Sequence, residues 1–373
     1  MKILLVKLSS LGDVVHALPV VQDIHAALPD AQIDWVVEKT FAPLVQSCPG
    51  VRRVIPCELR RWRKAPLSAV TRQEWSAFKA QLRDQAYDAV IDLQGLAKSA
   101  LVARLARMAP EGKRFALANQ TEGSGYEAPS RWVADVAIRL EPRIHAVQRS
   151  RELASRSLGY PLAVAVDFGL KVPPALVIKG LPAIDLVAGR VLFVHGTSRA
   201  DKEWPMGHWV ELGQRLMASG QRIAVLHGNA GELATSQAMV AALNSAAALA
   251  GVYSPASMST SISAAIKPAS AAAIVLPSLS LDEVLAALAG SAGVIGVDSG
   301  VSHIAVALNL PHVQIYNFDT AWRTGPGSMT AAAQGFDDAA VTSSSRQTSV
   351  FAQPTPGVEA VWQAWQGVSK AAR

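Results

Sequence analysis

Short apolar runs that alternate with helical patterns constrain this sequence most. Residues 3–6 read Ile-Leu-Leu-Val, the turn Ser9-Ser10-Leu11-Gly12-Asp13 follows, and a helical pattern extends from Val14 to about Ala27. An apolar run of this length before a turn and a helix is typical of a strand buried in a parallel sheet. Further strand patterns lie at 33–37, 51–55 and 89–93, and a helical pattern lies at 74–85. The sequence therefore predicts an α/β fold with parallel sheets covered on both faces.

A second α/β run follows a proline-rich stretch. Four prolines, at 161, 173, 174 and 182, interrupt any long element before residue 190. Strand patterns then lie at 191–194, 222–226 and 293–297, and helical patterns at 207–219 and 281–289. A chain of 373 residues is long enough for two domains of ordinary size.

These patterns predict two Rossmann-like domains. We place an N-terminal domain at 1–175, a linker at 176–190 and a C-terminal domain at 191–355, and we expect the carboxyl ends of their sheets to face each other across a cleft. The stretch at 245–277, rich in Ala and Ser, reads as an insertion. A C-terminal helix within 356–373 is expected to pack back on the N-terminal domain.

Composition excludes several classes of protein. Two cysteines, Cys48 and Cys57, cannot form a disulfide framework, and no Cys-x-x-Cys pair suggests zinc. The opening apolar run is too short for a signal peptide, so we expect a cytoplasmic protein. The uncharged stretch 245–266 is too poor in large apolar residues to span a membrane. A formal charge of +6 suggests an anionic partner, which could be nucleic acid, a phosphorylated molecule or an anionic membrane face.

Asp13 is the first candidate for chemistry. It lies in the turn after the first strand, where a short carboxylate is held in place and can accept a proton from a bound hydroxyl. The structural alternative is an aspartate that caps the following helix, and the two roles are compatible. His16, one turn later, is more often structural at such a site. No G-x-G-x-x-G follows the strand, which argues against a dinucleotide-dependent dehydrogenase.

The second candidate is a basic cluster, Arg60-Arg61-Trp62-Arg63-Lys64, in a segment without a clear helix or strand pattern. Guanidinium groups bind phosphate and carboxylate in a bidentate manner, so the cluster suits a multiply anionic ligand. A solvated basic loop is the plain alternative. A nucleic-acid patch is poorly supported, because the cluster is short in a chain with 29 acidic residues.

Two further candidates follow strands of the second domain. The segment 195–205 carries hydroxyls that can hold phosphate oxygens, and Lys202 can neutralise charge on a leaving diphosphate. The segment 297–303 reads Val-Asp-Ser-Gly-Val-Ser-His, in which Ser299 and Gly300 can offer amides to an anion at a helix start, and Asp298 can accept hydrogen bonds from sugar hydroxyls. A surface loop and an ordinary strand end are the structural alternatives.

Taken in order, these stretches resemble the lipopolysaccharide heptosyltransferases of glycosyltransferase family 9, and most closely their type I branch. The resemblance extends to about residue 316. The matching stretches are Ser9-Ser10-Leu11-Gly12-Asp13-Val14-Val15-His16-Ala17-Leu18-Pro19, Asp34-Trp35-Val36-Val37-Glu38, Arg60-Arg61-Trp62-Arg63-Lys64, Tyr87-Asp88-Ala89-Val90-Ile91-Asp92-Leu93-Gln94-Gly95-Leu96, Asp201-Lys202-Glu203-Trp204-Pro205 and Val297-Asp298-Ser299-Gly300-Val301-Ser302-His303.

The resemblance implies a GT-B fold and an inverting transfer of heptose from ADP-L-glycero-D-manno-heptose to the 3-deoxy-octulosonate (Kdo) residue of Kdo-lipid A, without a metal or other cofactor. Asp13 matches the base that deprotonates the acceptor. The residues that match donor contacts are Thr197, Ser198, Lys202, Glu232, Leu279, Asp298, Ser299, Gly300 and His303. Among them, Glu232 matches a ribose contact and Leu279 an apolar contact to adenine. Those that match the acceptor loop are Arg60, Arg61, Arg63 and Lys64.

The implied acceptor is a dense anion, as the basic cluster suggests. The expected partners are ADP-heptose, Kdo-lipid A and the anionic cytoplasmic face of the inner membrane, with no nucleic acid. After Tyr316 the chain reads Asn317-Phe318-Asp319-Thr320, where the family usually has a Gly-Pro-Thr turn. The alternatives are a related GT-B enzyme with another sugar or acceptor, or a non-catalytic binder of anionic glycolipid.

Overall fold

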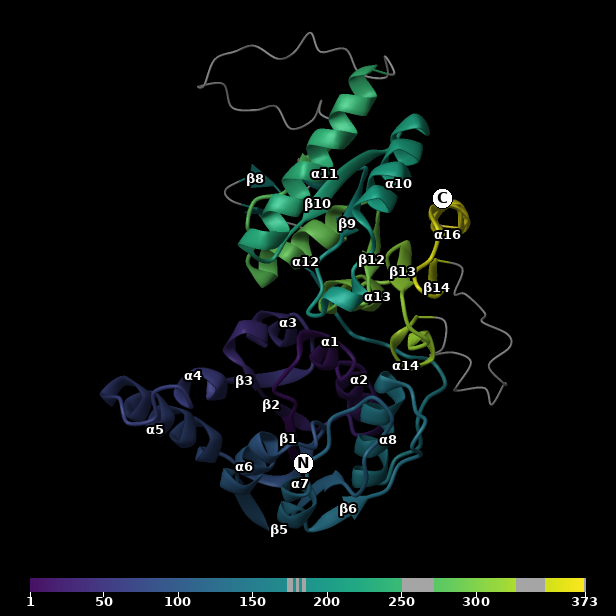
Figure 1. Ribbon diagram of the computed structural model, residues 1–373. Helices are drawn as coiled ribbons and strands as arrows, with labels where there is room; N and C mark the ends of the chain where they lie inside the picture. Colours follow the sequence, from purple (N-terminus) through teal and green to yellow (C-terminus); the bar gives the residue numbers. More distant parts are fainter. Residues whose placement is uncertain (173–176, 179–180, 183–185, 250–271, 327–345, 372–373) are drawn as a thin grey trace. The chain divides into compact units, whose positions relative to one another are not determined.

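The computed structural model describes residues 1–172, 177–178, 181–182, 186–249, 272–326 and 346–371 (Figure 1). Contacts between Cα atoms divide the chain into two compact units. Unit 1 begins at Met1 and extends to Lys171, and unit 2 begins at Val172 and includes the described C-terminal residues. Each unit is built around its own six-stranded sheet.

The sheet of unit 1 has the strand order β3-β2-β1-β4-β5-β6, and every pairing in it is parallel. Its strands are β1 (Lys2–Val6), β2 (Gln32–Glu38), β3 (Val51–Cys57), β4 (Ala86–Asp92), β5 (Arg107–Leu117) and β6 (Val136–Ile138). The order reverses between β1 and β4. Such a reversal opens a crevice at the carboxyl ends of the two strands, where ligands bind in doubly wound folds.

The helices of unit 1 connect these strands. They are α1 (Leu11–Val15), α2 (Pro19–Ala27), η1 (Lys39–Phe41), α3 (Ala42–Gln46), α4 (Leu59–Trp62), α5 (Ala69–Arg83), α6 (Ala97–Leu105), α7 (Pro129–Val133) and α8 (Ala146–Leu158). The single helix expected over 14–27 is two helices, because Pro19 has no N–H to donate and therefore starts α2. The first part of the basic segment expected to be irregular, residues 60–62, lies in α4, and Trp62 is buried in the core of the unit.

Unit 2 repeats the same arrangement with the order β11-β10-β9-β12-β13-β14, again entirely parallel. Its strands are β9 (Arg190–Val194), β10 (Arg222–Leu226), β11 (Ala273–Val275), β12 (Gly293–Val297), β13 (His312–Tyr316) and β14 (Gln347–Phe351). A short antiparallel pair, β7 (Val177–Ile178) and β8 (Leu181–Pro182), precedes them. The order reverses between β9 and β12.

The helices of unit 2 are η2 (Ala200–Lys202), α10 (Met206–Ala218), α11 (Ala230–Leu249), α12 (Leu281–Gly290), α13 (Gly300–Ala307), α14 (Ala321–Thr324) and α16 (Val358–Lys370). The expected insertion at 245–277 is shorter than the sequence suggested, because residues up to 249 complete α11 and residues 273–275 form β11. Its middle part, 250–271, lies outside the described residues.

The C-terminal helix α16 belongs to the core of unit 2. Val358, Val361, Trp365 and Val368 recur on one face at helical spacing and are buried against Leu216, Val313 and other residues of that core. The expectation that this helix packs back on the N-terminal domain is therefore wrong. Its apolar face completes the unit 2 core beside α10, β13 and β14.

None of the helices in the described part of the chain is both long and apolar enough to cross a membrane.

Candidate functional site

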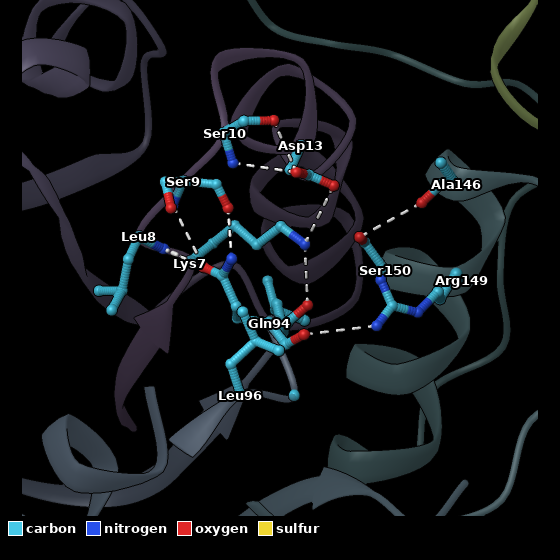
Figure 2. A network of polar contacts seen from close by, with 12 residues as sticks. Lys7, Leu8, Ser9, Ser10, Asp13, Gln94, Leu96, Ala146, Arg149 and Ser150 are labelled. Atoms are coloured by element: carbon cyan, nitrogen blue, oxygen red, sulfur yellow. Dashed lines mark hydrogen bonds and ion pairs between the residues drawn. The ribbon is translucent and has the colours of Figure 1, made fainter. Parts of the chain in front are cut away.

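Asp13 lies in the first turn of α1, directly after the central strand β1 of unit 1 (Figure 2). Its Oδ2 accepts hydrogen bonds from the backbone N–H of Ser10 at 2.9 Å and from the Ser10 hydroxyl at 2.8 Å. Ser10 is the N-cap of α1, so Asp13 is the reciprocal partner in the capping motif and not the N-cap itself. These bonds fix the carboxylate while its side chain stays 46% exposed, as access for a substrate requires.

The second oxygen of Asp13 faces a buried lysine. Nζ of Lys7 lies 3.9 Å from Asp13 Oδ1 and donates a hydrogen bond of 3.1 Å to the carbonyl of Leu93. Burial of the ammonium lowers the pKa of Lys7 to about 8, and the charge of Asp13 offsets part of this effect. In return, the charge of Lys7 and the Ser10 bonds outweigh the desolvation of Asp13 and lower the pKa of its carboxyl.

The turn before Asp13 is held by the segment after β4. The side chain of Gln94 accepts hydrogen bonds from the backbone N–H of Leu8 at 2.7 Å and of Ser9 at 3.1 Å, and it donates to the carbonyl of Ser9. Asp92 fixes this segment by accepting from the N–H of Gln94 at 2.9 Å. Arg149 of α8 donates to the carbonyl of Gln94 at 3.4 Å (Figure 2). The turn after β1, the segment after β4 and helix α8 therefore together position Asp13 where the strand order reverses.

Two cations converge on the hydroxyl of Ser9. Lys98 of α6 donates to Ser9 Oγ at 2.7 Å, and the Arg60 guanidinium donates to it at 3.4 Å. Burial lowers the pKa of Lys98, and the neighbouring charge of Arg60 lowers it further. Like charges gathered at one hydroxyl attract an anion, so this pair can hold a carboxylate or phosphate next to Asp13.

The other members of the predicted basic cluster lie elsewhere. Arg61 forms ion pairs with Glu58 at 2.8 Å and with Glu74 within its own segment, so its charge is compensated there. Trp62 is buried and donates from Nε1 to Glu74 at 2.8 Å. Arg63 and Lys64 are exposed beyond α4. Only Arg60 of the predicted cluster contacts the surroundings of Asp13.

Unit 2 brings three predicted residues together around Asp298. Nζ of Lys202 lies 2.6 Å from Asp298 Oδ2, and Nε2 of His303 lies 3.3 Å from Asp298 Oδ1. Thr197 donates from its hydroxyl to the Asp298 carbonyl at 3.3 Å. Burial raises the pKa of the Asp298 carboxyl, but the hydrogen bond and charge of His303 and the charge of Lys202 outweigh it and hold the pKa well below its usual range.

This cluster lies at the reversal between β9 and β12, as the unit 1 cluster lies at its own reversal. Ser299 is the N-cap of α13, and its Oγ accepts from the N–H of Ser302 at 3.4 Å. Gly300 is the first residue of that helix, and Ser198 is exposed in the turn after β9. Gly296 lets α13 approach β12, because a Cβ there would lie 2.4 Å from Ser302 Oγ.

Glu232 and Leu279 follow the neighbouring strands β10 and β11. Glu232 accepts hydrogen bonds from the Gly228 N–H at 2.6 Å and from the Asn229 amide at 2.7 Å. Its carboxylate fits beside Gly196, where an added Cβ would lie 2.5 Å from Oε2. Leu279 is half-buried immediately before α12. Every predicted donor residue thus follows one of four adjacent strands of the unit 2 sheet.

Several residues that build these sites are not among the predicted site residues, namely Lys7, Gln94, Lys98, Arg149 and Asn317. Asn317 donates to the carbonyls of Asp201 at 3.1 Å and Glu203 at 2.9 Å, and its Oδ1 accepts from Thr355 at 2.7 Å. It therefore fixes the η2 turn that carries Lys202. The departure of this segment from the Gly-Pro-Thr turn of the family marks it in the sequence, but the sequence does not show which carbonyls Asn317 binds.

Within the described ranges, no three His, Cys, Asp or Glu side chains are grouped so that they could hold a metal ion.

Comparisons with known proteins agree with each other. The model of the family described as glycosyltransferase family 9 (heptosyltransferase) matches residues 75–351. The curated lipopolysaccharide heptosyltransferase 1 of Pseudomonas aeruginosa is 34% identical over 323 residues, which cover 85% of this chain and 78% of that protein.

Two solved structures are also similar over nearly the full length. The structure of E. coli heptosyltransferase WaaC with ADP aligns with a TM-score of 0.75 and 31% identity, covering 97% of this chain and 98% of that one. The structure of WaaC with ADP-2-deoxy-2-fluoro heptose aligns with a TM-score of 0.69 and 31% identity, covering 99% of this chain and 98% of that one.

Proposed function

Because the chain belongs to glycosyltransferase family 9, the heptosyltransferases, we propose that it transfers L-glycero-D-manno-heptose from ADP-heptose to the Kdo residue of Kdo-lipid A. The P. aeruginosa relative is named a lipopolysaccharide heptosyltransferase, which supports a role in lipopolysaccharide synthesis, and we place this step in the inner core. The WaaC structures contain ADP and a fluorinated ADP-heptose, which supports a nucleotide-sugar donor for this chain. The observation that carries the proposal is Asp13, fixed by Ser10 yet open to a substrate.

Asp13 acts as the general base for the acceptor. Its carboxylate takes the proton of the acceptor hydroxyl while that oxygen attacks the anomeric carbon of heptose. The bond between the anomeric carbon and the diphosphate oxygen breaks, and its electron pair leaves with ADP. Attack opposite the leaving group inverts the configuration. Desolvation raises the pKa of Asp13, but the charge of Lys7 and the Ser10 hydrogen bonds lower it by more. The base is therefore ionised at neutral pH.

Arg60 and Lys98 bind the acceptor's anionic group. Both cations contact Ser9 Oγ, one residue from the Ser10 that holds Asp13. A sugar acid such as Kdo carries a carboxylate that this pair can bind by charge-assisted hydrogen bonds. Arg63 and Lys64 add positive potential farther along the acceptor segment, whereas Arg61 serves mainly to hold that segment through Glu58 and Glu74.

Unit 2 holds the donor. The diphosphate can be contacted by groups at the carboxyl ends of β9 and β12. These are the ammonium of Lys202, the hydroxyls of Thr197 and Ser198, and the amides of Ser299 and Gly300. Asp298 and His303 face the heptose, Glu232 the ribose and Leu279 the adenine. Lys202 is bound to Asp298 in this structure and would also neutralise charge on the leaving ADP, so the reaction is proposed to need no metal.

We place the enzyme at the cytoplasmic face of the inner membrane, in peripheral contact with it, because the acceptor is a lipid.

Mass spectrometry of the reaction product tests this function. The full chain is incubated with Kdo-lipid A and, in separate reactions, with ADP-heptose, ADP-glucose or UDP-glucose. A product heavier by one heptose residue, formed only with ADP-heptose, is the expected result. Transfer of another sugar would keep the glycosyltransferase assignment and overturn the donor. Tight ADP binding without transfer to Kdo-lipid A would overturn the acceptor.

A further inference from the structure

The turn after α4 and the first turn of α5 present apolar and basic side chains together at the surface of unit 1. Every residue from Arg63 to Val70 is exposed, and Leu67 and Val70 are 84% and 57% exposed. Arg63, Lys64 and Arg72 are the charged residues between 63 and 72, and no carboxylate lies among them. We call residues 63–72 the α4–α5 tip.

The tip is rigidly mounted. Trp62, Trp75 and Phe78 form a cluster with ring centroids 5.6 Å apart in each pair, and Trp62 and Phe78 belong to the buried core. The Ser68 hydroxyl caps α5 by accepting from the N–H of Thr71 at 3.1 Å. Figure 1 shows α4 and α5 at the periphery of unit 1, beside β3. Leu67, in the turn, and Val70, in the first turn of α5, are therefore exposed within ordered structure and not at a frayed end.

A single exposed aliphatic residue on a protein surface needs no explanation. Here, however, two aliphatic side chains and three cations lie within ten residues, in the turn after α4 and the first turn of α5. The acids nearest to them in the sequence, Glu58 and Glu74, are paired with Arg61. An anionic polymer in solution would satisfy the cations and leave Leu67 in water. An anionic bilayer satisfies both, because its headgroups attract the cations and its acyl region accepts the aliphatic side chains.

The position of the tip along the chain agrees with a lipid-borne acceptor. Arg60, at the start of the same segment, contacts Ser9 next to the base site, and Leu67 follows seven residues later. The segment thus joins the group that would bind the acceptor's sugar to the side chains that would enter the layer holding its acyl chains.

We infer that the α4–α5 tip docks the protein on an anionic lipid bilayer, with Leu67 and Val70 inserted between headgroups flanked by Arg63, Lys64 and Arg72. This inference rests on the proposed function in one respect only: the membrane is the one that carries the acceptor. Binding of the tip to lipid does not itself require catalysis.

Flotation of the full chain with vesicles tests the inference. Vesicles of phosphatidylglycerol and phosphatidylethanolamine are compared with vesicles of phosphatidylcholine alone, without donor or acceptor. The wild type should float with the anionic vesicles and much less with the neutral ones. The double variant Leu67→Ser/Val70→Ser should bind anionic vesicles about ten-fold more weakly, because two aliphatic side chains no longer leave water. The Arg63→Gln/Lys64→Gln variant should bind anionic vesicles roughly 10- to 30-fold more weakly than the wild type.

Val164→Ser is the matched control, because Val164 is 65% exposed and lies outside the tip. It should bind vesicles as the wild type does. Equal binding by Leu67→Ser/Val70→Ser and the wild type, or no preference of the wild type for anionic vesicles, would overturn the inference. So would tighter binding to a single-stranded oligonucleotide than to vesicles.

Activity assays separate this inference from the proposed function. The Leu67→Ser/Val70→Ser variant should retain wild-type turnover on an acceptor that lacks acyl chains and lose turnover on Kdo-lipid A embedded in vesicles. A chain without any heptosyl transfer that still floats would overturn the function and keep the docking surface. If the wild type and the variant both transfer heptose to the two acceptors equally well, the proposed function stands and the docking surface is overturned.

Discussion

At the scale of single residues, the two oxygens of Asp13 have separate partners. Oδ2 accepts from Ser10 and is thereby oriented, whereas Oδ1 faces the ammonium of Lys7 at 3.9 Å. Lys7 is almost fully buried, and its pKa of about 8 follows from that burial. The buried cation therefore controls the charge of the base without closing the side on which a substrate approaches.

Lys7→Met should change the pH dependence of the reaction. Removing the ammonium removes the charge that lowers the pKa of Asp13, so the acidic limb of kcat/KM should move to higher pH. Above this limb Asp13 is ionised in both enzymes, so the pH effect of the substitution should be confined to the acidic side.

Lys7→Arg is the control, because it keeps a positive charge beside Asp13. Its acidic limb should stay close to that of the wild type. A Lys7→Met enzyme whose limb does not move would show that the ammonium does not tune the base.

Residue types in the turns were predictable from the sequence, but their partners were not. Asp13 and Asp298 were found because each follows an apolar strand and precedes a helix. Gln94 and Lys98 contact Ser9 across 85 and 89 residues of sequence, so these contacts depend on the fold and not on a local pattern. The position of Arg61 in the basic cluster likewise did not reveal its ion pairs with Glu58 and Glu74, and its expected contact with the acceptor stays a prediction.

At the scale of elements, the close packing of the turns that follow β9 and β10 determines the position of the Glu232 carboxylate in the expected donor site. Gly196 follows β9, and the Glu232 carboxylate at the start of α11 occupies the space that a Cβ would need. The carboxylate is the far end of a flexible side chain, so a larger residue at 196 would displace Glu232 and leave the fold intact.

Gly196→Ala should therefore raise the Kd of ADP about ten-fold with little change in stability. Gly207→Ala is the matched variant, because no atom lies within 4 Å of an added Cβ at that position. Isothermal titration with ADP measures both. Equal affinities for the two variants would remove Glu232 from the ribose contact.

Trp365→Ala tests the placement of α16. Trp365 is 2% exposed in the unit 2 core, and its Nε1 donates to Gln221 at 3.0 Å. Its loss should destabilise the protein by about 3–5 kcal/mol. Gln366→Ala, on the exposed face of the same helix, should cost little. Urea unfolding followed by circular dichroism compares them, and equal midpoints would mean that α16 does not complete this core.

At the scale of the whole molecule, two sheets with the same strand order define the fold. In each sheet the first strand, β1 or β9, lies between the two halves of the strand order. The Asp13 cluster lies where the order reverses in unit 1, and the Asp298 cluster lies where it reverses in unit 2. This is the α/β architecture of the GT-B glycosyltransferases, and the expected fold class is confirmed by the match to WaaC. Alternating apolar runs could predict parallel sheets, because strands and helices have different periods. They could not predict strand order, which depends on the direction of each crossover and leaves no local pattern.

Turnover by Asp13→Ala beside the wild type tests the central claim most directly. Both proteins are assayed with ADP-heptose and Kdo-lipid A in EDTA, and ADP affinity is measured for each by titration. The wild type should form the heptose adduct without metal, and the variant should lose about 10²- to 10⁴-fold in kcat while it binds ADP as tightly as before. Asp13→Asn, which can keep a contact with Ser10, should be equally impaired. Near wild-type turnover by Asp13→Ala would contradict the assignment of Asp13 as the base.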